Sequence, residues 1–117
     1  MIEALLVGVG GAVGAVSRYL VGLALGDVEG PFPFETLAVN VVGSFLLGWV
    51  TFAGFGEGTL LVVGVGTCGA FTTFSSFSVD TVRLAEDETV VLAAGYALVN
   101  LLLSVGGVGL AALVATV

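Results

Sequence analysis

Charged residues are so sparse in this chain that they divide it into four long apolar runs. The runs cover residues 4–26, 36–56, 58–79 and 89–117, and Arg18 is the only charge inside them. Each run reaches the roughly 20 residues that a helix needs to cross about 30 Å of hydrocarbon. Barrel strands do not fit, because they alternate in polarity over about ten residues. The pattern predicts an all-α membrane protein with a single integral domain, 1–117, and helices at about 2–26, 34–54, 58–83 and 89–115.

Two of the predicted helices carry polar residues at helical spacing. Thr36, Asn40 and Ser44 recur every four residues in the second run, and Tyr96, Asn100 and Ser104 do so in the fourth. Residues at this spacing share one face of a helix. They offer hydrogen-bond donors and acceptors without a fixed charge. One such stripe is explained as well by contacts between helices, but two indicate a narrow, uncharged polar path.

The third run contains the segment GTCGAFTTFSSF at residues 66–77. Glycines and the β-branched pair Thr72 and Thr73 weaken a helix, and the serines compete for its backbone hydrogen bonds. The segment therefore predicts a break in the third helix. Carbonyls freed at membrane depth must be buried in protein or line a cavity, where they commonly hold a cation. Phe71, Phe74 and Phe77 share a face beside the break, and the positive rim of a phenyl ring can face a small anion.

Composition supports a membrane protein and excludes several function classes. The chain is 58% hydrophobic and 9% charged, with a mean hydropathy of +1.23, whereas soluble domains have roughly 25% charged residues. The net charge of −7 argues against nucleic acid as a partner. The absence of histidine and lysine leaves no nucleophile–base pair typical of an enzyme. Cys68 is the only cysteine, so an internal disulfide is excluded.

The charge distribution gives almost no signal for orientation in the bilayer. Lysine and arginine in short loops normally favour the cytoplasmic side, but this chain has only two such residues, both arginines. Arg18 lies inside the first run, where a charge faces water or a partner or snorkels to the interface. Only Arg83 lies near a loop. A chain with so little bias can insert in both orientations, which would allow an antiparallel homodimer.

Three segments match a known pattern: GGAVGAVSRY at 10–19, TLAVNVVGSFLLG at 36–48 and GTCGAFTTFSSF at 66–77. In these segments and the polar fourth helix, the chain resembles the Fluc (CrcB) family of fluoride channels over nearly its whole length. The third segment is the most specific of them. The family usually has G-G-x-T-T-F-S-T-F there, and this chain differs by Ala70 at the second glycine and Ser76 at the last threonine.

The resemblance implies an antiparallel, dual-topology homodimer with two pores. Its implied function is passive export of fluoride across the cell membrane, which limits fluoride toxicity. It also implies a structural sodium ion (Na⁺) on the dimer axis, held by the backbone carbonyls of Gly69 and Thr72 from both subunits.

The resemblance further assigns a fluoride pathway and a vestibule. Arg18 matches the family's arginine near the vestibule. At the position of Asn100, the family is expected to have a smaller residue with a hydroxyl group. The residues implied for the pathway are Asn40, Thr73, Phe74, Ser75, Phe77, Tyr96, Asn100 and Ser104.

Two other functions compete with a fluoride channel. Small multidrug exporters also have four helices, but proton-coupled export of cations needs a carboxylate inside the membrane. Glu3 lies at the end of the first predicted helix and Asp80 at the end of the third, and the second and fourth runs have none. A structural tetraspan protein is the other alternative, and it would not need two aligned polar stripes. The sequence favours a channel, and the choice of fluoride comes from the resemblance alone.

Overall fold

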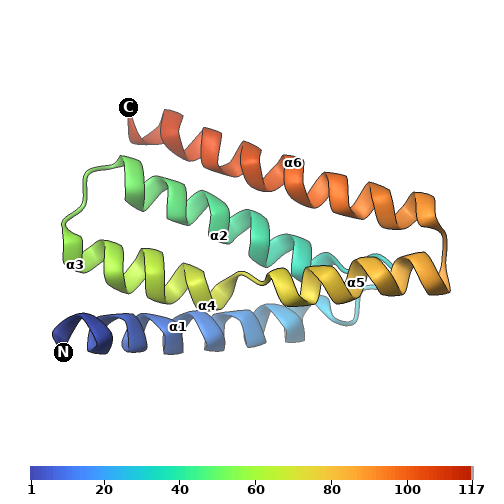
Figure 1. The fold of residues 1–117 in the computed structure, drawn as a ribbon, viewed down its shortest axis with the longest axis horizontal. Coiled ribbons are helices and arrows are strands. Elements are labelled where there is room, and N and C mark those ends of the chain that lie inside the picture. The colour runs from blue at the N-terminus through green and yellow to red at the C-terminus, as the bar shows by residue number, and fades with distance from the viewer. Residues whose placement is uncertain (117) are drawn as a thin grey trace.

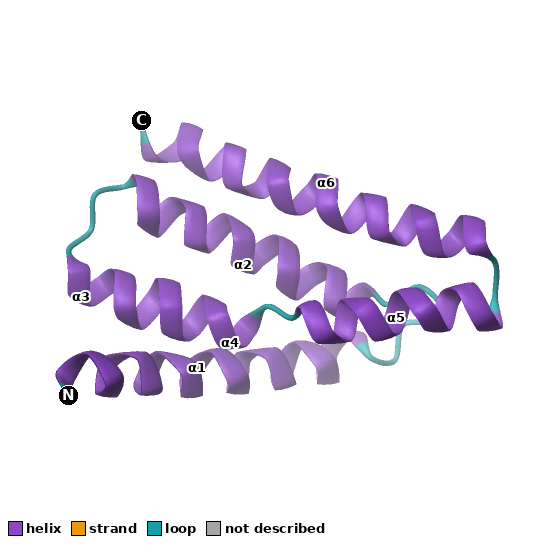
Figure 2. Cartoon of the chain, viewed as in Figure 1, coloured by secondary structure: helices purple, strands orange, loops and turns teal. Residues whose placement is uncertain are grey.

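Four long helical rods run alternately in opposite directions in the computed structural model, which describes residues 1–116 (Figure 1). Three rods are continuous: α1 (Ile2–Leu25), α2 (Phe34–Phe52) and α6 (Val90–Ala115). The third rod consists of α3 (Glu57–Thr59), the π-helical segment η1 (Leu60–Cys68), α4 (Gly69–Phe71) and α5 (Phe74–Asp87). Short loops join the rods (Figure 2). Both ends of the described chain lie at the same end of the bundle, as four crossings require.

All four rods are long and apolar enough to span a membrane. The longest dimension of the molecule is 45 Å, which exceeds the roughly 30 Å of a hydrocarbon core. These features confirm a multi-pass, all-helical membrane protein. Three rods end within two residues of the predicted bounds, but the third continues to Asp87 instead of ending near residue 83. The charges that were taken as its end lie on an amphipathic helix that continues beyond the apolar part of the rod.

Glycines allow α1 to pack directly on the first half of the third rod. A Cβ atom added at Gly10 would overlap the carbonyl of Val62, and one at Gly14 would overlap the carbonyl of Thr67. One added at Gly66 would lie 2.6 Å from the carbonyl oxygen of Val7. Small residues at such crossings let membrane helices approach closely, where van der Waals packing rather than the hydrophobic effect holds them together. The backbone contact fixes the position of the third rod up to its break.

The second half of the third rod packs mainly against α6 and its neighbours. A buried cluster of Leu84, Ala93 and Tyr96 lies there, with Phe32 and Phe77 packed against it. Tyr96 has no exposed surface, and its ring meets Phe32 edge-on at 5.3 Å between centroids. In α2, Gly43 lies directly against the side chain of Thr72. These contacts hold the break in the third rod between α2 and α6.

Candidate functional site

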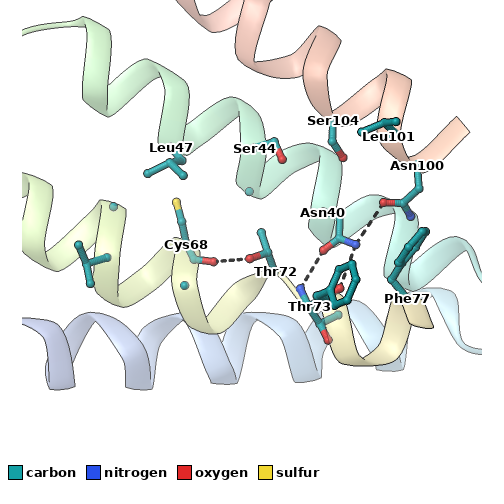
Figure 3. A pocket seen from close by; sticks show the side chains of 15 residues that line it. Asn40, Ser44, Leu47, Cys68, Thr72, Thr73, Phe77, Asn100, Leu101 and Ser104 are labelled. Carbon is teal, nitrogen blue, oxygen red and sulfur yellow. Dashed lines mark hydrogen bonds between the residues drawn. The ribbon is translucent and has the colours of Figure 1, made fainter. Parts of the chain in front are cut away.

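A cavity of about 540 Å³ lies between α2, the broken third rod and α6 (Figure 3). Its walls combine the break with the polar stripes of two helices, so it contains most of the site predicted from sequence. The predicted residues that line it are Asn40, Gly69, Thr72, Thr73, Phe74, Phe77, Asn100 and Ser104. Every one of these side chains is uncharged. The structure thus brings together residues from positions 40 to 104 around one hollow.

The helix breaks where the sequence predicted, at Thr72 and Thr73. Both residues have extended backbone, with ψ of 163° and 121° respectively. The side chain of Asn40 bridges the break: the Thr73 N–H donates to its Oδ1 at 2.8 Å, and its Nδ2 donates to the Thr73 carbonyl at 3.1 Å. The hydroxyl of Thr73 then accepts from the Ser76 N–H at 3.0 Å and caps α5. The break is therefore an ordered feature in which Asn40 pairs both backbone groups of Thr73.

The carbonyls of residues 69–72 lie at the break, and the helical partners of two of them, Gly69 and Thr72, bond elsewhere. The Gly69 carbonyl would accept from Thr73 N–H, which donates to Asn40 instead. The Thr72 carbonyl would accept from Ser76 N–H, which donates to the Thr73 hydroxyl. Arg18 Nη1 lies 3.4 Å from the Thr72 carbonyl oxygen, a long distance for a hydrogen bond. Exposed carbonyl oxygens of this kind are the ligands that a hard cation such as sodium prefers.

A cation at this place would depend on the backbone. Within residues 1–116, no three His, Cys, Asp or Glu side chains lie together as a metal site. The residues that the resemblance implies for sodium, Gly69 and Thr72, would offer only their backbone carbonyls, and that of Thr72 also accepts from Arg18. A Cβ at Gly69 would meet no other atom within 4 Å, so one subunit leaves this face of the break open.

Two buried donors on α6 have no partner in the described part of the chain. They are the Nδ2 of Asn100 and the Oγ of Ser104. The Oδ1 of Asn100 accepts from Asn40 Nδ2 at 3.3 Å, so only the nitrogen of the Asn100 amide is left over. A buried polar group without a partner costs about 1–3 kcal/mol. Such groups in a native structure usually mark a place where a ligand or water belongs.

Aromatic rings form one wall of the same region. The rings of Phe74 and Phe77 lie 5.7 Å apart between centroids, and Phe77 lies 5.6 Å from Tyr96. Phe74 is 79% exposed, whereas Tyr96 is completely buried. The partial positive charge at the rim of a phenyl ring allows Phe74 and Phe77 to face an anion without a formal cation. This aromatic wall can therefore face an anion although none of its side chains carries a charge.

Comparison with known proteins identifies the family. The family model described as CrcB-like protein, Camphor Resistance (CrcB), matches residues 5–114, which is nearly the whole chain. The chain belongs to the CrcB family. This confirms the resemblance inferred from the three sequence segments.

Several proteins that are similar to this CrcB-family chain are named as fluoride-specific ion channels. "Fluoride-specific ion channel FluC 2" of Haloarcula marismortui is 55% identical over 107 residues, covering 91% of this chain and 87% of the relative. "Fluoride-specific ion channel FluC 1" of Halobacterium salinarum is 54% identical over 108 residues, covering 92% and 86%. A more distant relative, "Fluoride-specific ion channel FluC" of Novosphingobium aromaticivorans, is 44% identical over 108 residues and covers 86% of each chain. The names describe channels and not enzymes.

The hydrogen bonds of Asp80 in this CrcB-family chain were not predicted from the sequence. Asp80 lies within α5 and not at the end of the third rod. Its Oδ2 accepts from the Thr36 hydroxyl at 2.7 Å and from the Tyr96 hydroxyl at 3.3 Å. Thr36 belongs to the first turn of α2, so Asp80 lies level with the end of that span. The signal was present in the sequence, because Thr36 and Tyr96 begin the two polar stripes and Asp80 lies three residues after Phe77.

Three predicted residues of the CrcB-family site lie outside the cavity. Tyr96 is buried beside it and bonds Asp80. Ser75 is exposed on the first turn of α5. Arg18 is exposed and lines a separate hollow of about 190 Å³ together with Thr73. Periodicity placed Tyr96 on its helix and the resemblance supplied Ser75 and Arg18, but neither could say which residues share one cavity.

Proposed function

We propose that this chain is a fluoride-selective ion channel that lets fluoride leave the cell passively and so limits its toxicity. Membership of the CrcB family and the names of relatives at 55% and 54% identity support this function. The structural observation that carries it is the cavity, which is lined by uncharged donors and phenyl rings inside a bundle of membrane-length helices. An anion can be held there by N–H, O–H and ring-edge contacts without a fixed positive charge that would bind it too tightly.

The two half-helices at the break provide an electrostatic basis for such a pathway. α5 begins at Phe74, and the N-terminus of a helix carries partial positive charge that favours anions. The preceding half ends at Phe71, where the C-terminal partial negative charge and the freed carbonyls favour a cation. Phe74 and Phe77, in the first turn of α5, are the residues proposed to face fluoride. The break thus separates a place for a cation from a path for an anion.

We further propose that the working unit is an antiparallel homodimer of dual topology. One subunit leaves both Gly69 and the ring of Phe74 uncovered, although both line the cavity. A second copy in the opposite orientation would cover these positions and complete the wall of each pore. Four spans are also too few to enclose a pore while every polar stripe is buried.

Sodium is proposed as a structural ion of this dimer. The carbonyls of Gly69 and Thr72 from both subunits would hold it on the axis. When bound, the ion would neutralise carbonyl dipoles that lipid cannot satisfy. The chain itself contributes the break, the bridging amide of Asn40 and the cap from Thr73, which engage the amides that would otherwise bond these carbonyls.

Ion flux from liposomes tests the proposed function. Purified protein should release fluoride down its gradient without ATP and without a proton gradient, and chloride should leave far more slowly. The motivation is a cavity lined without any carboxylate, while Asp80 in the same rod is bonded by two hydroxyls. Equal chloride and fluoride flux would refute selectivity. Strict dependence on a proton gradient would instead favour a small multidrug-type exporter, and no flux of any ion would favour a structural tetraspan protein.

A further inference from the structure

One turn of α2 contacts both residues at which the third rod breaks. Asn40 bonds the backbone of Thr73: its Oδ1 accepts from the Thr73 N–H at 2.8 Å, and its Nδ2 donates to the Thr73 carbonyl at 3.1 Å. Gly43, three residues further along α2, lies against the side chain of Thr72. Residues at this spacing share one face of a helix, and all four residues line the 540 Å³ cavity. The same face of α2 therefore holds the break by one polar contact and one steric contact.

The side chain of Thr72 has a single orientation in this setting. Its hydroxyl donates to the Cys68 carbonyl at 2.9 Å (Figure 3), and its N–H donates to the same carbonyl at 3.0 Å. A β-branched side chain is stiff at χ1, so the bonded hydroxyl also fixes the direction of the methyl group. That direction leads to α2, where the methyl carbon of Thr72 occupies the place that a Cβ atom on Gly43 would need. Glycine at this position leaves room for the methyl group, and alanine would not.

The peptide unit between Thr72 and Thr73 is held at both ends. The Thr72 carbonyl and the Thr73 N–H belong to this one planar unit. Asn40 holds the N–H, and Gly43 confines the side chain of Thr72. Together these contacts fix the direction of the Thr72 carbonyl, whose oxygen lies 3.4 Å from Arg18 Nη1. They also fix where α5 begins, because Thr73 is the residue that caps it.

We propose that Gly43 is a positioning residue of the ion pathway, which sets the peptide unit between Thr72 and Thr73 by receiving the methyl group of Thr72. This inference rests on the proposed fluoride channel and adds a residue that touches no ion. In that channel the Thr72 carbonyl belongs to the proposed cation site, and Thr73 precedes the first turn of α5, where the anion path is proposed. A displacement of this peptide unit would therefore disturb both. Gly43 and Thr72 are matched in shape, so a change in one should be offset by the right change in the other.

Gly43→Ala tests the steric contact. It adds the Cβ atom that overlaps the methyl group of Thr72. Alanine is a better helix former than glycine, so a loss cannot come from helix propensity. We expect fluoride flux from liposomes to fall by about tenfold or more, because a misplacement of about 1 Å at a functional site can cost up to about a hundredfold in rate.

Thr72→Ser is the compensating change. It removes only the methyl group and keeps the hydroxyl that bonds the Cys68 carbonyl. Alone it leaves a small void and should lower flux less than Gly43→Ala does. Combined with Gly43→Ala it makes room for the new Cβ atom, so the double variant should recover flux to within about threefold of the unchanged protein, a strongly non-additive result.

Nuclear magnetic resonance reports the position of the break directly. The chain has two asparagines, Asn40 and Asn100, and no glutamine, so ¹⁵N-labelled protein has two side-chain amide groups, and the spectrum of Asn100→Ser identifies that of Asn40. The Asn40 signal should shift in Gly43→Ala, because its partner Thr73 moves with the peptide unit. It should return towards its original position in the double variant, although that protein carries the same alanine. A general loss of stability would not produce this return.

Gly48→Ala is the control substitution in the same helix. A Cβ atom there would lie 3.1 Å from the Cβ of Ala111 and 3.2 Å from the Cα of Val108, both on α6 rather than on the third rod. Whatever this variant costs in stability or flux, Thr72→Ser should not restore it, and the Asn40 signal should stay in place.

The outcomes separate this inference from the function on which it rests. If the unchanged protein passes no fluoride, the proposed function fails, whereas the shift of the Asn40 signal and its return still decide whether Gly43 positions the break. If fluoride passes but Gly43→Ala conducts normally or leaves the Asn40 signal unmoved, the role of Gly43 is overturned. A double variant no better than Gly43→Ala also overturns it. If Gly43→Ala fails to fold, a folded and conducting double variant supports the match, and a double variant that fails while Thr72→Ser alone folds refutes it.

Discussion

Phe74 and Phe77 differ in how one subunit surrounds them, although both line the same cavity. Phe77 packs against buried Tyr96 at 5.6 Å, so its position is fixed within the subunit. Phe74 is 79% exposed, and its ring contacts Phe77 from the outer side. In the proposed dimer, a second copy would cover the ring of Phe74 and make it part of a defined wall. The two phenylalanines therefore test different parts of the proposed channel, namely the subunit and the dimer.

Replacing Phe77 or Phe74 with isoleucine should separate the effect of bulk from that of the ring edge. Isoleucine keeps an apolar side chain but removes the positive rim that faces the anion. We expect fluoride flux in each variant to fall by about tenfold or more, equivalent to ~1.4 kcal/mol in the barrier. The dimer should survive in detergent, as judged by size-exclusion chromatography. Phe52→Ile, at the far end of α2, serves as the control.

Normal flux in both Phe→Ile variants would rule out the ring-edge mechanism. The polar groups of α2 and α6 would then have to account for the path alone. If Phe77→Ile conducts poorly and Phe74→Ile conducts normally, the anion meets only the ring that is fixed within the subunit.

At the scale of elements, the sequence predicted the break in the third rod but not what holds it. Thr72 and Thr73 could be identified because glycine, β-branched and hydroxyl residues all disfavour helix there. Periodicity also placed Asn40 on a polar face of α2. Periodicity does not identify the residue that such a face contacts, so the pairing of Asn40 with the Thr73 backbone is known only from the structure. The end of the third helix was also misplaced: it was predicted near residue 83, whereas the helix continues to Asp87.

Two glycines in neighbouring elements should respond differently to valine. Gly14 in α1 lies against the Thr67 carbonyl, and a Cβ there would also lie 3.1 Å from the Ala70 side chain. Gly14→Val should therefore damage the subunit, with overpacking costs of about 1–3 kcal/mol or more. Gly69→Val adds its side chain to open space in one subunit. We expect this variant to keep its helical circular-dichroism signal but to lose the dimer, because the side chain projects where the second copy is proposed to lie.

Chromatography and thermal unfolding distinguish these two outcomes. A Gly69→Val protein that remains dimeric and conducts fluoride would contradict the placement of the break at the subunit interface. A Gly14→Val protein as stable as the original would show that α1 can move away from the third rod without loss.

At the scale of the whole molecule, almost nothing in the charge pattern selects an orientation in the membrane. The bundle ends in short loops, and acidic residues contribute little to the choice of side. Arg83 lies near the end of the bundle that holds the α5–α6 connection, and Arg18 lies within α1. A single arginine near one end is a weak signal compared with the lysine-rich and arginine-rich loops of proteins with a fixed orientation. The charge pattern is thus compatible with insertion in both orientations, which the proposed antiparallel dimer requires.

Oppositely biased variants would test this requirement. One variant carries Asp27→Lys and Glu29→Lys in the α1–α2 loop, and the other carries Ala53→Lys and Glu57→Lys at the opposite end of the bundle. Each variant should insert mainly in one orientation, as shown by labelling a C-terminal tag from each side of the membrane, whereas the unchanged chain should be labelled from both sides. Each variant expressed alone should give little fluoride flux, and co-expression should restore it, because only the mixture supplies antiparallel pairs. Full flux from one variant held in a single orientation would instead show that parallel subunits, or one subunit, make the pore.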